Sequence, residues 1–292
     1  MNRIKGILYA AVSSSTFGLA PFFSITLLLA GFSAFEVLSY RWGVASIVLI
    51  VFGWLSGCNF RLAGKDWGVV FLLSLLRAVT SFSLIIAYQN IASGVASTIH
   101  FMYPLAVALV MMFFFREKKS LLVILAVLMS LLGAALLSLG ELEAKSGNTM
   151  VGLVAACVSV FSYAGYIVGV RTTRVVQINS TALTCYVMGL GTIFYLIGAY
   201  CTSGLQLVSD GYTWLIILGL ALPATAISNI TLVQAIKYAG PTLTSILGAM
   251  EPLTAVVIGV FVFKELFTVN SAVGIILILL AVSIVVFRRQ KS

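Results

Sequence analysis

The chain has 292 residues, of which 61% are hydrophobic and only 9% charged, and its mean hydropathy is +1.16. An ordinary soluble domain carries about 25% charged residues, so this composition excludes a soluble globular protein and indicates an integral membrane protein. The formal net charge of +9 does not indicate a nucleic-acid partner, because the basic residues stand in small groups between apolar runs, as in the cytoplasmic loops of membrane proteins.

Apolar runs of about 20 residues, the length of a helix that crosses a bilayer, follow one another along the chain. We predict ten such spans, at residues 4–30, 34–56, 67–90, 94–115, 120–140, 150–170, 179–201, 211–236, 241–263 and 268–287. Helices are expected throughout, because a membrane barrel would need strands of about ten residues with alternating polarity. The 25 glycines favour close packing of these helices.

Basic residues predict the orientation of the chain. The chain starts with MNRIKG, and the apolar run then continues through residue 30 without a small-residue cleavage site, so we expect the first span to be retained. One set of loops contains Arg3, Lys5, Arg61, Lys65, Arg116, Lys118, Lys119, Arg171, Arg174, Lys237, Arg288, Arg289 and Lys291. The opposite set contains Glu36, Glu141, Glu143, Asp210 and Glu265, with Lys145 and Lys264 as exceptions. This asymmetry predicts a multi-pass protein of the inner (cytoplasmic) membrane with both termini cytoplasmic.

A pattern near residue 100 returns 148 residues later without gaps. Ser97, Met102, Pro104, Leu105, Phe113, Phe115 and Glu117 recur as Ser245, Met250, Pro252, Leu253, Phe261, Phe263 and Glu265. Residues 1–145 and 146–292 would then form two halves with five spans each, and an odd number of spans forces the halves into opposite orientations. Inverted repeats of this kind are typical of secondary transporters. The predicted fold class is all-α integral membrane, with ten transmembrane helices as two inverted five-helix repeats around a central cavity.

Three stretches carry a family resemblance: MEPLTAVVIGVFVFKE from residue 250, its weaker copy MYPLAVALVMMFFFREK from residue 102, and Arg41 within LSYRWGVASIVLI. The chain resembles, over essentially its whole length, the EamA-type branch of the drug/metabolite transporter superfamily. The resemblance implies a ten-helix bundle whose central cavity is bordered mainly by the first, third, fourth, sixth, eighth and ninth helices. Tyr103 stands where the second half has Glu251, so a pseudo-symmetric pair of carboxylates is absent.

Arg77, His100 and Glu251 lie deepest in the predicted spans, and ionisable residues at such depth are functional candidates by default. Glu251 stands before Pro252, which disfavours helix at the glutamate and can leave polar backbone facing a cavity. Its carboxyl could exchange a proton and contact substrate, or it could be a structural acid in a kinked helix. Arg77 keeps its charge and needs a partner, either Glu251 or a carboxylate or phosphate of the substrate.

Neutral side chains share helix faces with these charges. Ser81 and Tyr88 follow Arg77 along one stripe of the third span. His100 and Tyr103 are three residues apart in the fourth span, where the histidine could relay protons or be a neutral side chain bonded to another helix.

Two further pairs are candidates in the second half. Tyr163 and Tyr166 could stack on a substrate or only pack, and Ser228 and Asn229 could bind a zwitterion or another helix. The complete set of predicted substrate-binding residues is Arg77, Ser81, Tyr88, His100, Tyr103, Tyr163, Tyr166, Ser228, Asn229 and Glu251.

One cation, one anion, one imidazole and several aromatic or hydroxyl groups would match a small amphoteric solute. We therefore expect a secondary transporter of amino acids or related small metabolites, working by alternating access, with export as the direction that the resemblance favours. Candidate hinge points are Pro21, Pro104, Pro223, Gly248 and Pro252. The expected partners are a small-molecule substrate, membrane lipids and protons, without nucleic acid, metal or cofactor.

Two alternatives stay open. A carrier of organic cations, choline-like or multidrug, could use Glu251 with the tyrosines as an acidic aromatic site. A membrane enzyme is less favoured, because the single histidine of the chain lies in an apolar span and no catalytic set is visible beside it.

Overall fold

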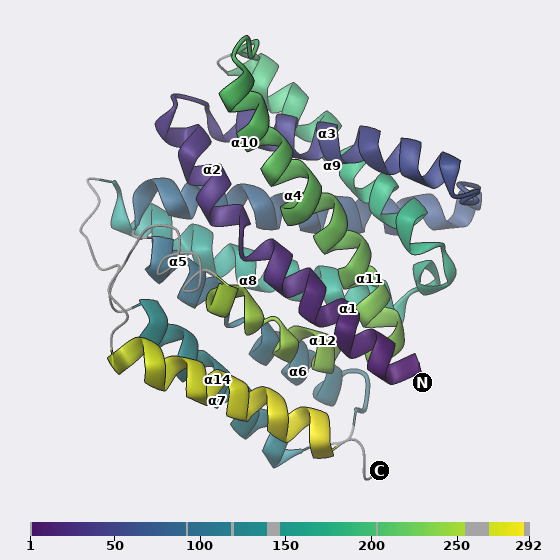
Figure 1. Ribbon diagram of the computed structural model, residues 1–292. Coiled ribbons are helices and arrows are strands. Elements are labelled where there is room, and N and C mark those ends of the chain that lie inside the picture. The colour runs from purple at the N-terminus through teal and green to yellow at the C-terminus, as the bar shows by residue number, and fades with distance from the viewer. Residues whose placement is uncertain are drawn as a thin grey trace.

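The computed structural model of the chain describes residues 2–91, 93–117, 120–138, 147–202, 204–254 and 269–288. Within these ranges every regular element is a helix (Figure 1). The first half contains α1 (Asn2–Phe17), α2 (Ala20–Leu29), α3 (Ala34–Leu55), η1 (Gly64–Asp66), α4 (Trp67–Asn90), α5 (Ser93–His100), α6 (Tyr103–Phe113) and α7 (Leu121–Ser138). The second half contains α8 (Thr149–Thr172), η3 (Arg174–Gln177), α9 (Ser180–Cys201), α10 (Gly211–Ala221), η4 (Leu222–Ile227), α11 (Ser228–Ala239), α12 (Pro241–Leu247) and α14 (Val269–Arg288).

Seven helical stretches among the described residues are long and apolar enough to cross a membrane. They are Arg3–Leu29, Ala34–Leu55, Gly64–Asn90, Val95–Phe113, Thr149–Thr172, Ser180–Cys201 and Gly211–Ala239. The fifth and tenth predicted spans contain the shorter apolar stretches Leu121–Gly133 and Ala272–Ile284, and the ninth leaves the described residues after Thr254. A helical, multi-pass membrane protein is therefore confirmed, while the count of ten and the inverted orientation of the halves stay predictions.

Several of these spans are interrupted near their middle. Pro21 lies in the first turn of α2 and Pro104 in the first turn of α6, and Pro223 lies in η4, a six-residue π-helix between α10 and α11. Proline has no N–H to continue the helical ladder, which explains why the helices break there. α12 ends at Leu247, and helical structure resumes at Met250. The predicted hinge positions thus mark real interruptions, and movement at them stays a prediction.

Each of the most extensive helix contacts joins one helix from each half of the chain. α4 packs on α8, α7 on α14, α1 on α11 and α3 on α9. In Figure 1, α3, α9 and α10 lie at one end of the stack and α7 and α14 at the other, with α1, α4, α8 and α11 between them. The two halves therefore build one common core rather than two separate ones.

Small residues let these helices approach closely. A Cβ added at Gly6 of α1 would lie 2.7 Å from the backbone nitrogen of Ala239, and one at Gly133 of α7 would lie 2.7 Å from the Gly274 carbonyl oxygen of α14. Glycine at both positions removes that obstacle, as is common where helices pack in lipid.

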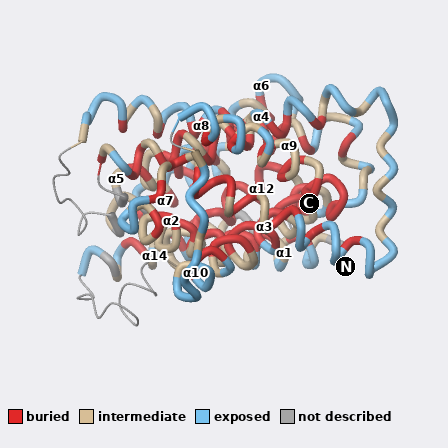
Figure 2. The backbone as a smooth tube through the Cα atoms, turned by 90° about the horizontal axis from the view of Figure 1, so that it is seen from above, coloured by how far each residue is buried: buried red, intermediate tan, exposed pale blue. Residues whose placement is uncertain are grey.

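The outer and inner surfaces of the bundle differ as expected for a protein in a bilayer. Figure 2 shows buried residues gathered in the middle of the molecule and exposed residues on the outer turns. Large apolar side chains such as Leu29, Phe52 and Leu121 are exposed there, on a surface suited to lipid. α1 begins and α14 ends at the same end of the molecule (Figure 1), and that this end is cytoplasmic stays a prediction.

Polar side chains define where helices start. Ser33 caps α3 in a capping box, in which its Oγ accepts from the Glu36 N–H and the Glu36 carboxylate accepts from the Ser33 N–H. The same carboxylate accepts from the Gln206 N–H at 2.6 Å, which ties the start of α3 to the segment before α10. α10 begins after Asp210, whose carboxylate accepts from the Thr213 N–H, and this hydrogen bond lowers the pKa of Asp210.

Candidate functional site

Arg77 lies near the middle of α4, with only 1% of its surface exposed. Its Nε donates to Oδ1 of Asn229 on α11 at 3.0 Å, and its Nη1 makes a longer contact of 3.5 Å with Oγ of Ser81, one turn along α4. Asn229 in turn donates from Nδ2 to the Thr225 carbonyl at 2.7 Å. The structure thus brings the predicted residues Arg77, Ser81 and Asn229 together, and contact with substrate stays a prediction.

A second buried guanidinium comes from α3, at a residue that sequence reasoning did not count among the deep charges. Arg41 is 4% exposed, donates from Nε to Thr225 Oγ1 at 2.6 Å, and makes a longer contact of 3.4 Å from Nη2 to the Ala224 carbonyl. Both acceptors belong to the π-helix η4. The signal was present in the sequence, because Arg41 stands inside an apolar span, where arginine is rare unless it has a partner or a function.

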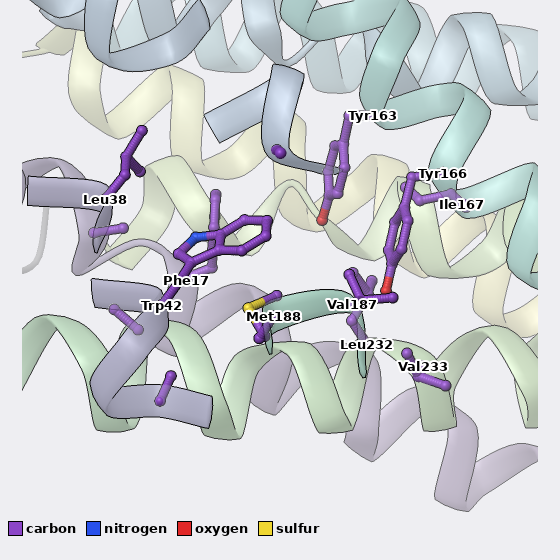
Figure 3. Packing of buried hydrophobic residues seen from close by; sticks show 14 of the residues in the cluster. Phe17, Leu38, Trp42, Tyr163, Tyr166, Ile167, Val187, Met188, Leu232 and Val233 are labelled. Carbon is purple, nitrogen blue, oxygen red and sulfur yellow. The ribbon is translucent and has the colours of Figure 1, made fainter. Parts of the chain in front are cut away.

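Aromatic rings surround the two guanidinium groups. Phe17, at the end of α1, has its ring centroid 5.6 Å from Arg41 Cζ and 5.3 Å from Arg77 Cζ. Arg77 Cζ also lies 4.9 Å and 5.9 Å from the rings of Tyr163 and Tyr166. Figure 3 shows these two tyrosines of α8 side by side, and their planes differ by only 5°. Cation–π contacts of this kind contribute about 2 kcal/mol when desolvated, so the rings help to hold Arg77 in place.

His100, at the end of α5, is 4% exposed and contacts α8. Its Nδ1 lies 2.9 Å from Oγ of Ser159, and its ring stacks on Tyr163 with centroids 5.3 Å apart. This geometry agrees with the prediction of a histidine bonded to a neighbouring helix. Its Nε2 has no hydrogen-bond partner among the described residues, and neither has the hydroxyl of Tyr166.

Glu251 follows the end of α12 and is partly exposed. The Tyr103 hydroxyl donates to its Oε1 at 3.4 Å. A Cβ added at Gly248 would lie 1.8 Å from that same hydroxyl oxygen, so glycine at 248 makes room for the tyrosine. A Cβ added at Gly18 would lie 2.6 Å from the Glu251 carbonyl oxygen. The interruption between α1 and α2 therefore packs directly on the backbone of the glutamate.

Tyrosines separate the carboxylate from the nearer guanidinium. The centroids of the Tyr103 and Tyr163 rings lie 4.6 Å apart. The Tyr163 ring in turn makes a cation–π contact with the Arg77 guanidinium. Arg77 and Glu251 do not form an ion pair in the described structure; Arg77 instead bonds the neutral side chains of Asn229 and Ser81. The direct Arg77–Glu251 pair that the sequence left open is therefore not the arrangement found.

At two further predicted site residues the structure shows hydrogen bonds that link neighbouring helices. The Tyr88 hydroxyl lies 3.5 Å from Oγ of Ser97, which links α4 to α5, and its ring packs in a separate apolar cluster. At Ser228 the backbone carbonyl accepts from Oγ of Ser13 at 2.8 Å, which links α11 to α1, and both alternatives for the Ser228 side chain stay predictions. Several predicted residues lie outside the described ones, namely Lys118, Lys119, Glu141, Glu143, Lys145, Phe261, Phe263, Lys264, Glu265, Arg289 and Lys291.

The described centre therefore contains two guanidinium groups and one carboxylate, held between interrupted helices that are apolar on the outside. Charges at this depth are costly and persist in membrane proteins where a polar solute or an ion is handled. Interrupted helices near the middle of the bilayer are typical of transporter binding sites. The fold and the site together define a multi-pass membrane protein with a polar centre, the general design of secondary transporters.

Comparisons with known proteins agree with this design. The model of the EamA-like transporter family matches the chain twice, over residues 4–139 and 150–287. The chain belongs to the EamA-like transporter family. The comparison with curated proteins finds no match. A solved structure titled only "Crystal structure of protein" is similar over 100% of this chain and 99% of that chain, with a TM-score of 0.81 and 18% sequence identity, a likeness that shows the fold alone.

Proposed function

We propose that the chain is a secondary transporter that moves amino acids or related small metabolites across the membrane by alternating access. The family supports the transporter class. The interruptions beside Gly18, Pro104, Pro223 and Gly248 are where the helices would bend as the site opens to one side and then to the other. Export is the proposed direction, and the inner membrane with both termini cytoplasmic is the proposed location.

The observation that carries the proposal is the separation of opposite charges at the centre. Arg41 and Arg77 lie together against Phe17, whereas Glu251 lies beyond Tyr103 and Tyr163. An amino acid has a carboxylate and an ammonium group, which would meet the guanidinium groups and the carboxylate respectively. Glu251 is also the proposed site of proton exchange, because it is partly exposed and is the acidic group of this cluster.

The organic-cation alternative is disfavoured by the position of Arg77. Tyr163 and Tyr166 would have to present their faces to a quaternary amine. Both rings already contact the Arg77 guanidinium, whose Cζ lies 4.9 Å and 5.9 Å from their centroids. A ligand cation at these rings would lie beside a permanent positive charge, which repels it.

Counterflow in liposomes tests the proposal. Purified protein is reconstituted in vesicles loaded with one unlabelled amino acid, and entry of the same labelled amino acid is followed over time. We expect entry above that of protein-free vesicles for at least one amino acid, and its loss in Glu251→Gln. Arg61→Gln removes an exposed charge in the segment between α3 and η1 and is the matched control, expected to behave as the parent chain. Counterflow of choline-like cations alone would contradict the proposal and restore the alternative.

A further inference from the structure

The charges at the described centre do not balance. Arg41 and Arg77 are both buried and cannot lose their protons. The carboxylate of Glu251 is connected to Arg77 through two tyrosines, because Glu251 contacts Tyr103, Tyr103 contacts Tyr163, and Tyr163 contacts Arg77. Within the described residues neither arginine forms an ion pair, and their acceptors are a threonine hydroxyl, an asparagine amide oxygen, a serine hydroxyl and a backbone carbonyl. With Glu251 ionised the three groups sum to one positive charge, and with Glu251 protonated they sum to two.

Each of the two guanidinium groups also has N–H donors that form no hydrogen bond with the described residues. Each has five N–H donors in a planar fork. Hydrogen bonds to the described residues use Nε and Nη2 of Arg41 and Nε and Nη1 of Arg77. Nη1 of Arg41 and Nη2 of Arg77 therefore stay available on two side chains that share the Phe17 ring. Paired guanidinium donors are the usual receptor for carboxylate, phosphate or sulfonate oxygens.

A hydrogen-bond acceptor is linked to Arg77 through the ring of Tyr163. Ser159 Oγ donates to the Ala156 carbonyl at 2.6 Å, so its single hydrogen is used. Nδ1 of His100, 2.9 Å from the same Oγ, must then be the N–H donor, and Nε2 is left as an unprotonated acceptor. That Nε2 has no partner among the described residues, although His100 is 4% exposed. Tyr163 contacts both the imidazole and the Arg77 guanidinium, so acceptor and cation flank one ring.

These observations define the chemistry of the substrate. We infer that the substrate is a small organic anion: its carboxylate, or another oxyanion group, binds between Arg41 and Arg77, and a hydroxyl or amino group donates to His100 Nε2. The inference rests on the proposed transport function and deepens it. A monoanion makes the centre neutral when Glu251 is ionised, whereas a neutral zwitterion leaves one positive charge in the middle of the bilayer. An acidic amino acid or a hydroxy acid is therefore preferred over a neutral amino acid of equal size.

The test compares aspartate with asparagine, which have nearly the same size and differ by one negative charge. Thermal unfolding of the full chain in detergent is followed against increasing concentrations of each, and of methanesulfonate as a simple anion, at constant ionic strength set with sodium chloride. We expect aspartate to raise the unfolding temperature at a concentration at least about tenfold lower than asparagine does, a difference of about 1.4 kcal/mol. Succinate is expected to act between the two. It lacks the amino group, so it binds the arginines but leaves His100 Nε2 without a donor, and as a dianion it carries one negative charge more than the centre needs for neutrality.

Variants separate binding from mere structure. Arg41→Gln and Arg77→Gln are each expected to abolish the preference for aspartate, and Arg61→Gln, which removes an exposed positive charge, is expected to keep it. Glycerol phosphate identifies the oxyanion: if it stabilises the chain at a lower concentration than either dicarboxylate, the anion site stands and its ligand is a phosphate ester. If a variant does not fold, the aspartate and asparagine series on the parent chain still decides.

The outcomes distinguish the two proposals. Equal or stronger stabilisation by asparagine would overturn the anion inference while leaving the amino-acid transporter intact. Stabilisation by methanesulfonate as strong as by aspartate would also overturn it, because the arginines would then attract anions without selecting one. Counterflow of neutral amino acids without counterflow of aspartate would overturn the inference alone, whereas no counterflow of any amino or organic acid would remove the proposed function as well.

Discussion

The two halves of the chain match the same family model, yet they contribute opposite chemistry to the centre. At the offset of 148 residues, Tyr103 of the first half corresponds to Glu251 of the second, and the two side chains meet at 3.4 Å. His100 corresponds in the same way to Gly248. The first half supplies the imidazole and both guanidinium groups, and the second supplies the carboxylate. A repeated backbone can therefore place a charge asymmetry across one polar centre.

Applied to the rest of the chain, the same offset of 148 residues relates the arginines to residues that hold them. It pairs Arg77 with Thr225 and Ser81 with Asn229. Arg77 donates hydrogen bonds to Ser81 and to Asn229, the residue that the offset pairs with Ser81. Arg41 donates a hydrogen bond to Thr225, the residue that the offset pairs with Arg77. Where the first half has a cation, the second half thus offers a neutral acceptor. Among the described residues, this division leaves both guanidinium groups without a carboxylate partner.

The largest expected effect comes from removing the cation of the first half. Arg77→Met is expected to lower counterflow at least about 100-fold, because each charge-assisted hydrogen bond contributes about 1.5–3 kcal/mol and Asn229 Oδ1 is left without its donor. Arg77→Lys should lie between, since lysine keeps the charge but lacks the planar fork. Initial rates in liposomes at matched protein content give the comparison. Full activity of the methionine variant would show that the asymmetry has no role in transport.

A glycine tests the meeting of the equivalent residues. Gly248→Ala is expected to lower the free energy of unfolding by about 1–3 kcal/mol, because its Cβ would lie 1.8 Å from the Tyr103 hydroxyl. Adding Tyr103→Phe should restore part of the loss, since it removes that oxygen. Gly189→Ala on α9 is the matched control, with no atom within 4 Å of the added Cβ. Equal stability of the two alanine variants, measured by denaturant unfolding, would contradict the packing described.

The position that corresponds to His100 in the second half is a glycine, and the tautomer of the histidine can be observed directly. Because the chain has a single histidine, nitrogen NMR of the protein without a histidine tag reports on His100 alone. We expect a protonated Nδ1 and an unprotonated Nε2 at neutral pH. Ser159→Ala removes the acceptor of Nδ1, so it should mix the tautomers and cost about 1 kcal/mol of stability. A protonated Nε2 in the parent chain would refute the acceptor described.

The smallest effects are expected at the starts of α3 and α9, two helices from different halves that pack together. Ser33→Ala and Asn179→Ala each remove an N-cap, at a cost of about 1 kcal/mol. The loss should be larger at Ser33, because the capping box also positions Glu36, which binds the Gln206 N–H. Thermal unfolding of the two single variants shows which N-cap contributes more to stability. A larger loss at Asn179 would place the stronger cap in the second half.

Much of this could be predicted from the sequence, because it depends on local composition. Apolar runs predicted the helices, prolines marked most of their interruptions, and a charge within an apolar run identified Arg77, His100 and Glu251. Arg41 was missed as a deep residue because it stands in the first third of its span, where a charge can also face the membrane surface. Its depth became clear only when Thr225, 184 residues away, was found as its acceptor.

The sequence by itself therefore determined the membrane class, the helices and the charges available to the centre, because hydropathy and chain-breaking residues act over one or two turns. Only the tertiary structure decided which charges meet. Helical periodicity tells which residues share a face but not which face lies opposite, so it could not separate an Arg77–Glu251 pair from the observed Arg77–Asn229 and Tyr103–Glu251 contacts. Those contacts depend on helices distant in the chain packing side by side.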